Sequence, residues 1–211
     1  MSEGMALEKL AEEHARLQGY FTLVRVPFKP PRAKGKKHRG NTDFDVLGYH
    51  PRDHKVLIIE VKAYGPPEVY RNWSYRPWER SITTRWVGNV AKKWSQFVKL
   101  EKGRAWGLRV EDLGEIRVVI PGFWDVDRKG FEKWLESRIW RKHKFRTKVC
   151  VVPIHDLVLD TIRLVSEDKI VRRVRYADTA LEAFRWLTRR PEHHHEQLSA
   201  ILWSKSEKAQ H

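Results

Sequence analysis

The stretch Val56-Leu57-Ile58-Ile59-Glu60-Val61-Lys62 joins an uninterrupted apolar run to one acidic and one basic residue. A short run of β-branched and aliphatic residues is typical of a buried strand. Side chains alternate across a strand, so Glu60 and Lys62 are expected to project from the same face. Charges beside an apolar core are costly to bury unless they are paired or hold a metal. This stretch therefore predicts a sheet strand that ends in a functional site.

A second acidic segment, Asp43-Phe44-Asp45-Val46-Leu47-Gly48, lies just upstream and also reads as a strand. By the same alternation, Asp43 and Asp45 are expected to share a face. If the two strands pair as a hairpin through a turn at residues 50–54, their carboxylates converge beside Lys62. Oxygen ligands suit Mg²⁺, which keeps several waters and binds phosphates readily. The pattern predicts a phosphodiester-cleaving site in which Asp45 and Glu60 hold Mg²⁺, or Mn²⁺ in its place, and Lys62 orients or activates the attacking water.

Asp45, followed fifteen positions later by Glu60-Val61-Lys62, resembles the PD-(D/E)xK nuclease superfamily, which includes restriction endonucleases and archaeal Holliday-junction resolvases. In that family a metal-binding Asp ends one strand motif, and an acid-x-Lys motif lies on the next strand. The family often has Pro before the Asp, and here no Pro precedes either Asp, so Asp43 stays open as the ligand. Asp45 is preferred because Asp-Val-Leu-Gly matches the family's Asp followed by apolar residues and Gly. The resemblance covers residues 5–153.

The resemblance implies further site residues on two helices. A Glu on the first helix often supplies another carboxylate, and the family's spacing points to Glu8, with Glu12 one turn on as the alternative. The competing interpretation is that both are solvated acids, like Glu13. The helix after the acid-x-Lys strand often sends a Gln or Lys towards the scissile phosphate. Gln96 and Lys92 fit that role, within a polar stripe that is otherwise typical of a solvated helix face: Arg85, Asn89, Lys92, Gln96 and Lys99.

Periodicity predicts an α/β fold with a restriction-endonuclease-like mixed central sheet flanked by helices. Helices are expected at 5–18, at 84–102 with Gly103 closing it, and at 129–144. Strands are expected at 20–28, 43–49, 55–63, 115–121 and 148–153. The nuclease-like core is thus assigned to residues 1–153. Residues 154–211 form a C-terminal helical extension with a polar tail, packed on the core; its expected elements are helices at 154–166 and 179–189 and an extended piece at 171–176.

The net charge of +15 and the sequence pI of about 10.0 favour a polyanionic partner, nucleic acid before membrane. Two loops are expected to contact it. Residues 25–39 carry seven basic residues and no acidic one, with Lys34, Lys36, Lys37 and Arg39 as the predicted contacts. Residues 64–81 interleave aromatic residues with arginines, and Arg71 and Arg76 are the predicted contacts there. DNA is favoured over RNA as the partner, and a homodimer is left open.

No apolar stretch approaches the roughly 18–20 residues that span a bilayer, and the first residues do not resemble a signal peptide. The single cysteine, Cys150, excludes an intrachain disulfide and fits a reducing cytoplasm. The function predicted from these observations is a metal-dependent nuclease that hydrolyses DNA phosphodiesters, structure-selective or non-specific. The alternatives are a nucleic-acid-binding protein that keeps the fold without cleaving, and an RNA nuclease.

Overall fold

The computed structural model describes residues 3–30, 42–62, 77–121 and 127–167 of the 211. The chain divides into two compact units, Met1–Val158 and Leu159–His211. Almost all described residues belong to the first unit, and the fold below is that of the first unit. Within the described residues, no helix is long and apolar enough to cross a membrane.

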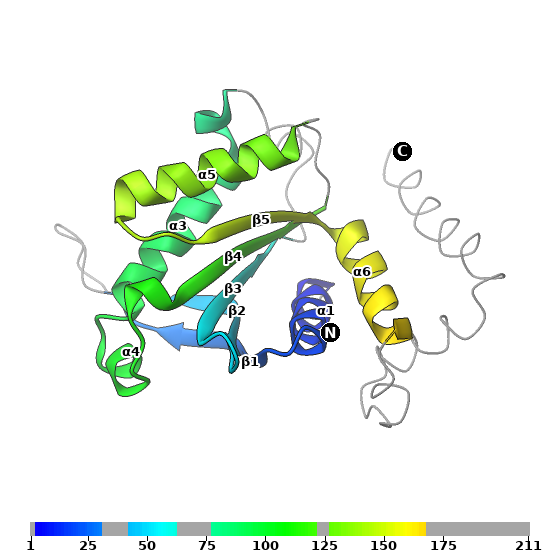
Figure 1. Ribbon diagram of the computed structural model, residues 1–211, viewed down its shortest axis with the longest axis horizontal. Helices are drawn as coiled ribbons and strands as arrows, with labels where there is room; N and C mark the ends of the chain where they lie inside the picture. The colour runs from blue at the N-terminus through cyan, green and yellow to red at the C-terminus, as the bar shows by residue number, and fades with distance from the viewer. Residues whose placement is uncertain (1–2, 31–41, 63–76, 122–126, 168–211) are drawn as a thin grey trace. The chain divides into compact units, whose positions relative to one another are not determined.

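A single mixed sheet organises the first unit (Figure 1). Its strand order is β1-β2-β3-β4-β5, with bounds β1 Phe21–Phe28, β2 Thr42–His50, β3 Lys55–Val61, β4 Leu113–Ile120 and β5 Lys148–Pro153. The first three strands pair antiparallel as a meander, and β3, β4 and β5 run parallel. The predicted α/β class, a mixed central sheet flanked by helices, is confirmed.

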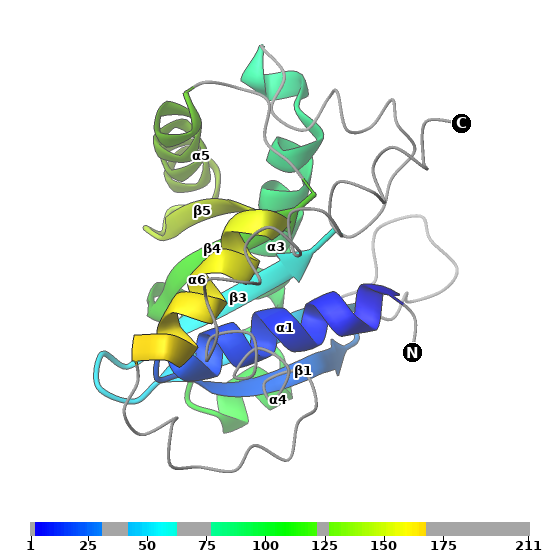
Figure 2. The same ribbon diagram turned by 90° about the vertical axis from the view of Figure 1, so that its right-hand side faces the viewer.

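Helices cover both faces of the sheet, with α3 and α5 on one side and α1 on the other (Figures 1 and 2). The helical segments are α1 Glu3–Leu17, η1 Trp78–Arg80, α3 Ile82–Phe97, α4 Glu101–Ala105, η2 Val110–Asp112, α5 Arg128–His143 and α6 Ile154–Glu167. The larger core lies beneath α3 and α5, and Trp94 and Phe97 are fully buried in it. The smaller core lies beneath α1, where Ala11 and Ala15 pack on β2, β3 and β4 residues. Neighbouring parallel strands must be joined by a crossover connection, usually a helix. Here α3 connects β3 to β4, and α5 connects β4 to β5.

The helix predicted at 84–102 is confirmed as far as Phe97 and is wrong beyond it. The helix α3 ends at Phe97, the chain turns through Val98–Leu100, and α4 begins at Glu101. Gly103 does not close the first helix; it lies inside α4 and packs against the backbone of Phe97 so closely that a Cβ would collide with the Phe97 carbonyl oxygen. The glycine is therefore needed for a close approach of two backbones rather than for a helix end. Six apolar side chains of α3 and of the turn after it are buried: Val87, Val90, Ala91, Trp94, Phe97 and Val98.

The pairing of β1 with β2 is interrupted where the candidate site begins. Val24 pairs with Val46 and Val26 with Phe44, while Arg25 between them has a positive φ of 50°. Phe44 packs in the larger core and Val46 in the smaller one, although regular alternation would place both on one face. The regular alternation assumed for Asp43 and Asp45 is therefore wrong, because the strand changes face at Asp45. Such local irregularity is a common way to re-aim a side chain next to a site.

Candidate functional site

The carboxyl end of β3 positions Glu60 and Lys62. Strand β3 ends at Val61, and the backbone N–H of Lys62 donates to the Val119 carbonyl oxygen at 2.9 Å, which extends the parallel pairing by one residue. Lys62 Nζ lies 2.7 Å from Glu60 Oε1, as expected for two residues on one face of a strand. The Glu60 side chain is 9% exposed, so this carboxylate is held at the edge of the apolar core.

Asp45, rather than Asp43, turns its carboxylate towards this pair. Asp45 Oδ2 accepts a hydrogen bond from the backbone N–H of Val61 at 2.7 Å and lies 4.0 Å from Lys62 Nζ. The hydrogen bond from the Val61 amide thus holds the Asp45 carboxylate beside Glu60 and Lys62, the two sequence neighbours of Val61. Asp43 contributes its backbone carbonyl instead, as the acceptor from Lys93 Nζ at 3.1 Å. The structure therefore brings Asp45, Glu60 and Lys62 together, the three residues around which the sequence analysis was built.

A second lysine that the sequence analysis did not select completes the cluster. Lys93 Nζ on α3 lies 3.6 Å from Glu60 Oε2, and its side chain is 23% exposed. The sequence analysis followed the exposed stripe that contains Lys92, but Lys93 borders the buried side of the same helix. Lys93 lies seven residues, two turns, after Trp86, which contacts the same site. A lysine next to the apolar stripe of a helix that packs on the strand was the available signal.

The indole of Trp86 covers one side of Lys62. Lys62 Nζ lies 6.0 Å from the centroid of the Trp86 ring, at the outer limit of a cation–π contact. The Lys62 side chain is 25% exposed, so it is enclosed by Glu60, Asp45 and the indole yet open to solvent on the remaining side. The strand therefore holds Lys62 by its backbone and the helix limits where its ammonium group can go.

Two ammonium groups face the two carboxylates of this cluster, but the hydrogen bonding of the carboxylates is incomplete. Burial, and after it the negative charge of Glu60, raises the pKa of Asp45 to about 6, against the opposing effects of the Val61 hydrogen bond and Lys62. Glu60 Oε2 is buried, and no described donor lies within hydrogen-bond distance of it. A buried carboxylate oxygen without a donor is unfavourable in a native protein. A cation bound between Asp45 and Glu60 would relieve both features.

The glutamates of α1 differ in their distance from this cluster. Glu8 forms a bidentate pair with Arg25, with Nε donating to Oε2 at 2.7 Å, and its charge contributes to the raised pKa of Asp45. Glu12 is 4% exposed and is held by Lys9, Arg16 and Thr22. Glu13 is also buried, so the solvated interpretation of Glu12 and Glu13 is wrong. Their burial follows from the lysine and arginine one turn away on α1, which compensate both acids. Of the two alternatives, Glu8 is the one electrostatically coupled to Asp45.

The carboxylate oxygens of Asp45 and Glu60 are the kind of ligand that a hard divalent cation prefers, but they are few in number. Within the described ranges, no group of three or more His, Cys, Asp and Glu side chains forms a metal-binding cluster. Asp45 and Glu60 supply two carboxylates, the number that Mg²⁺ commonly takes from a protein before water and substrate phosphate complete its shell. The two ammonium groups of Lys62 and Lys93 balance these carboxylates, so a bound cation would require Lys62 to give up its pairing with Glu60.

Other predicted site residues lie elsewhere. Gln96 is half-buried and forms no hydrogen bond with the carboxylates, and Lys92 lines a different hollow beside Arg138 and His143. The predicted nucleic-acid contacts of the two basic loops fall outside the described residues: Lys34, Lys36, Lys37, Arg39, Arg71 and Arg76. Cys150 is half-buried rather than fully in the core, and burial raises the pKa of its thiol to about 11.

A second buried polar cluster, centred on Arg117 of β4, was not found from the sequence. The Arg117 side chain is 8% exposed, with Nε donating to Glu115 Oε1 at 2.8 Å. A terminal nitrogen of the same guanidinium lies 3.0 Å from His14 Nδ1 and donates to Gln18 Oε1 at 3.1 Å. An arginine in the middle of an apolar strand, Ile116 to Ile120, was the signal for a buried and fully paired charge.

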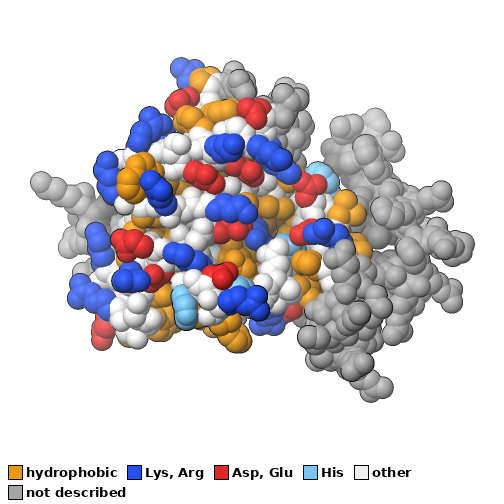
Figure 3. Space-filling view, viewed as in Figure 1, with side chains coloured by type: hydrophobic (Ala, Val, Ile, Leu, Met, Phe, Trp, Pro, Cys, Tyr) orange, Lys and Arg blue, Asp and Glu red, His pale blue; other side chains and the backbone are white. Residues whose placement is uncertain are grey.

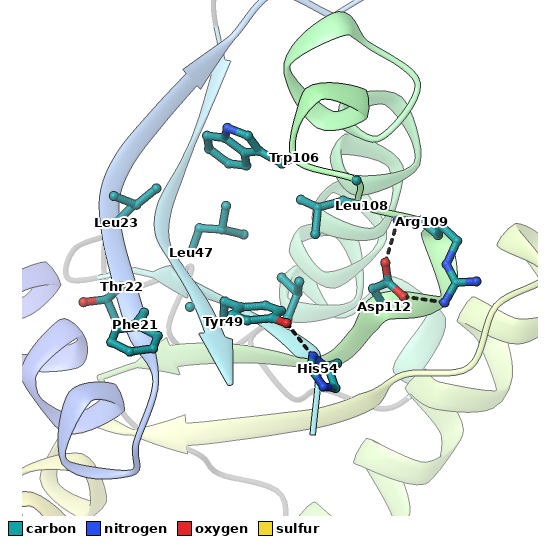
Figure 4. Close-up of a pocket in the computed structure, with 13 residues that line it drawn as sticks. Phe21, Thr22, Leu23, Leu47, Tyr49, His54, Trp106, Leu108, Arg109 and Asp112 are labelled. Carbon is teal, nitrogen blue, oxygen red and sulfur yellow. Dashed lines mark hydrogen bonds and ion pairs between the residues drawn. The ribbon is translucent and has the colours of Figure 1, made fainter. Parts of the chain in front are cut away.

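An apolar hollow of about 660 Å³ lies on another part of the sheet, at the β1 edge (Figure 4). In Figure 4 the side chains of Leu23, Leu47, Trp106 and Leu108 surround it, from β1, β2 and the turn after α4. Among the described residues that line it, Asp112 is the one carboxylate, and it is engaged by the backbone and guanidinium of Arg109. The hollow therefore offers apolar surface without a carboxylate pair like that of Asp45 and Glu60.

Comparisons with known proteins identify no family for this chain. No family model matches it, and no curated protein matches it. Among solved structures, it is similar to the crystal structure of a protein of unknown function, AF1548, with 13% sequence identity, 89% of this chain and 95% of that chain covered, and a TM-score of 0.33.

Proposed function

We propose that this protein is a metal-dependent nuclease that hydrolyses DNA phosphodiester bonds at the carboxyl end of β3. The observation that carries the proposal is the convergence of Asp45, Glu60 and Lys62, with Glu60 Oε2 buried without a hydrogen-bond donor. The resemblance of Asp45 and Glu60-Val61-Lys62 to the PD-(D/E)xK motif supports the same interpretation. The net charge of +15 supports a polyanionic substrate.

In the proposed reaction Asp45 and Glu60 hold Mg²⁺, or Mn²⁺ in its place. When bound, the ion supplies charge stabilisation at the scissile phosphate and a more acidic water. Lys62, released from Glu60, positions the attacking water and offsets negative charge that develops on the phosphate. The water oxygen forms a bond to phosphorus, the bond to the leaving oxygen breaks, and the leaving oxygen takes up a proton.

The roles of the neighbouring residues follow from their contacts. Lys93 holds Glu60 Oε2 from the α3 side and the Asp43 carbonyl from β2, so it links the two strands that carry the metal-binding acids. The Val61 amide keeps the Asp45 carboxylate oriented towards Glu60. The Trp86 ring, 6.0 Å from Lys62 Nζ, limits the movement of that ammonium group on one side. The carboxylates are thereby pre-organised before the substrate binds.

The experiment that tests the proposal is a cleavage panel with labelled linear, flapped, junction and single-stranded DNA beside RNA, in Mg²⁺ and in excess chelator. We expect cleavage of at least one DNA substrate in Mg²⁺ and none in chelator. Glu60→Gln, which keeps the side-chain shape but removes the charge, is the matched variant and is expected to be inactive. Full cleavage in chelator, or by the Glu60→Gln protein, would overturn the proposal. If only RNA is cleaved, the proposed mechanism stands and RNA replaces DNA as the substrate.

A further inference from the structure

The hollow between α3 and α5 is lined by five basic side chains. It has a volume of about 560 Å³, and its cations are Arg80, Arg85, Lys92, Arg138 and Lys142. One acidic residue, Glu79, lines it. Hydrogen-bond donors without charge line it as well, among them Asn89. The hollow therefore gathers positive charge and neutral donors in one concave surface, the composition that suits phosphate oxygens.

These five cations have no carboxylate partners among the described residues. Elsewhere in the described chain, arginines commonly form ion pairs: Arg16 with Glu12, Arg25 with Glu8, Arg109 with Asp112, Arg117 with Glu115 and Arg128 with Asp156. On the face shown in Figure 3, Lys and Arg side chains are likewise interspersed with acidic ones. The hollow differs because, within the described residues, none of its five cations is paired with a carboxylate, although Arg138 stacks on the Trp134 ring at 5.4 Å. Uncompensated charge lining a concave surface concentrates an attractive potential for anions.

His143 also lines the hollow, and the nearby cations affect its pKa. Its Nε2 atom is buried without a hydrogen-bond partner in the described structure. Burial lowers the pKa of His143, and the charges of Lys142 and Lys92 lower it further. The imidazole thus stays neutral beside the cations.

We propose that the α3–α5 hollow binds the sugar–phosphate backbone of DNA away from the scissile phosphate, as a second contact for the same substrate. This inference rests on the proposed function for the identity of the nucleic acid. Lys92 in the hollow and Lys93 at the candidate site are adjacent in sequence, so a single helix presents one cation to each. A duplex that reaches from one side of α3 to the other would contact both surfaces.

Salt dependence of DNA binding tests the hollow directly. The variant Arg85→Gln/Lys92→Gln/Lys142→Gln removes three exposed cations from it. The matched control, Lys99→Gln/Arg104→Gln/Lys133→Gln, removes one arginine and two lysines from exposed positions outside the hollow, so both proteins lose the same net charge. Binding of a labelled DNA duplex is measured in chelator over a KCl series, and circular dichroism checks the fold.

We expect the hollow variant to lower the slope of log affinity against log salt by roughly 2–3, and the control by less than about 1. Equal slopes for the two variants would overturn the inference. If the triple variant does not fold, Arg85→Gln/Lys142→Gln against Lys99→Gln/Arg104→Gln gives the same test with an expected slope change of roughly 1–2. If the hollow variant shows the expected change of slope but the wild-type protein cleaves nothing in Mg²⁺, the nuclease proposal is refuted and the inference that the hollow binds DNA stands. If the wild-type protein cleaves DNA but the hollow and control variants have equal salt slopes, only the inference that the hollow binds DNA is refuted.

Discussion

Two groups of charged side chains are buried against the same sheet, and they differ in how completely their charges are satisfied. Around Arg117, every guanidinium nitrogen has a partner among Glu115, His14 and Gln18. Around Glu60, one carboxylate oxygen has no described hydrogen-bond donor, and the pKa of Asp45 is raised to about 6. The Arg117 cluster links the α1 region to β4, whereas the Glu60 cluster pairs its carboxylates with two lysines but leaves one buried oxygen without a hydrogen bond.

This difference separates a stabilising cluster from a candidate functional one. A fully paired buried charge is costly to disturb because removing one partner leaves the others unsatisfied. A partly satisfied cluster lowers the stability of the fold unless a ligand completes it, and such sites are where binding and catalysis concentrate. Variants at the two clusters are therefore expected to change different quantities, with stability falling at Arg117 and chemistry failing at Glu60.

The largest expected effect on stability comes from Arg117→Met. The substitution keeps apolar volume but leaves Glu115 with Lys148 at 3.8 Å as its remaining ion-pair partner, so we expect a loss of about 3 kcal/mol in the free energy of unfolding. Urea unfolding measures it. The control is Arg109→Met, whose pair with Asp112 has a 78% exposed arginine and is expected to change stability by less than about 1 kcal/mol. Equal effects of the two substitutions would remove the contrast between buried and exposed pairs.

Lys62→Ala is expected to lower single-turnover cleavage by on the order of 10²–10³ while DNA binding stays nearly unchanged. The reason is that a group acting on the water and the developing phosphate charge interacts more strongly in the transition state than in the bound substrate. Cleavage rates at saturating DNA and a binding titration on the same protein separate the two effects. Normal cleavage at saturation would exclude Lys62 from the site, and an equal loss of affinity would make it a phosphate contact.

Asp45→Asn is expected to stabilise the fold at pH 7.5. The raised pKa means that the folded chain holds the Asp45 proton more tightly than the unfolded chain, so the wild type loses stability as the pH rises from about 4 to about 6. An increase from 3.8 to about 6 corresponds to roughly 3 kcal/mol at most, and we expect a gain of about 2 kcal/mol because asparagine cannot ionise.

Urea unfolding in chelator at pH 7.5 and pH 4 measures this gain. The difference between the two proteins should vanish at pH 4, where wild-type Asp45 is protonated in the folded state. Asparagine can still accept the hydrogen bond from the Val61 amide, so the comparison isolates the charge. An Asp45→Asn protein that is less stable than wild type at pH 7.5 would show that the charge is favourable where it lies, as the charges around Arg117 are.

The smallest effect is expected from Lys93→Gln, with cleavage slowed by roughly tenfold, about 1.4 kcal/mol in transition-state stabilisation. Lys93 touches Glu60 and the Asp43 carbonyl rather than the proposed water, so it acts by positioning the carboxylate. Lys99→Gln, in the turn that follows the same helix and exposed, is the control. Added Mg²⁺ should restore part of the rate if Lys93 positions a metal ligand. A rate loss insensitive to the Mg²⁺ concentration would contradict that role.

Much of the fold and the centre of the candidate site could be predicted from the sequence, because both depend on local patterns. The apolar run before Glu60 predicted a buried strand, and acid-x-Lys alternation placed Glu60 and Lys62 on one face, as found at 2.7 Å. Periodicity correctly predicted a helix over most of α3. The break after Phe97 was missed because it depends on the close contact between Gly103 and the Phe97 backbone, which no local pattern reveals.

What the sequence determined by itself was the order of elements, the strong positive charge and the presence of acids and a lysine on two neighbouring strands, because composition and alternation are properties of the chain. What only the tertiary structure decided was which groups meet. The change of face at Asp45, the approach of Lys93 from α3 and the gathering of cations between α3 and α5 all arise where separate elements pack. The physical reason is that a periodic pattern fixes the face on which a side chain lies, whereas distances between faces follow from the packing of the core.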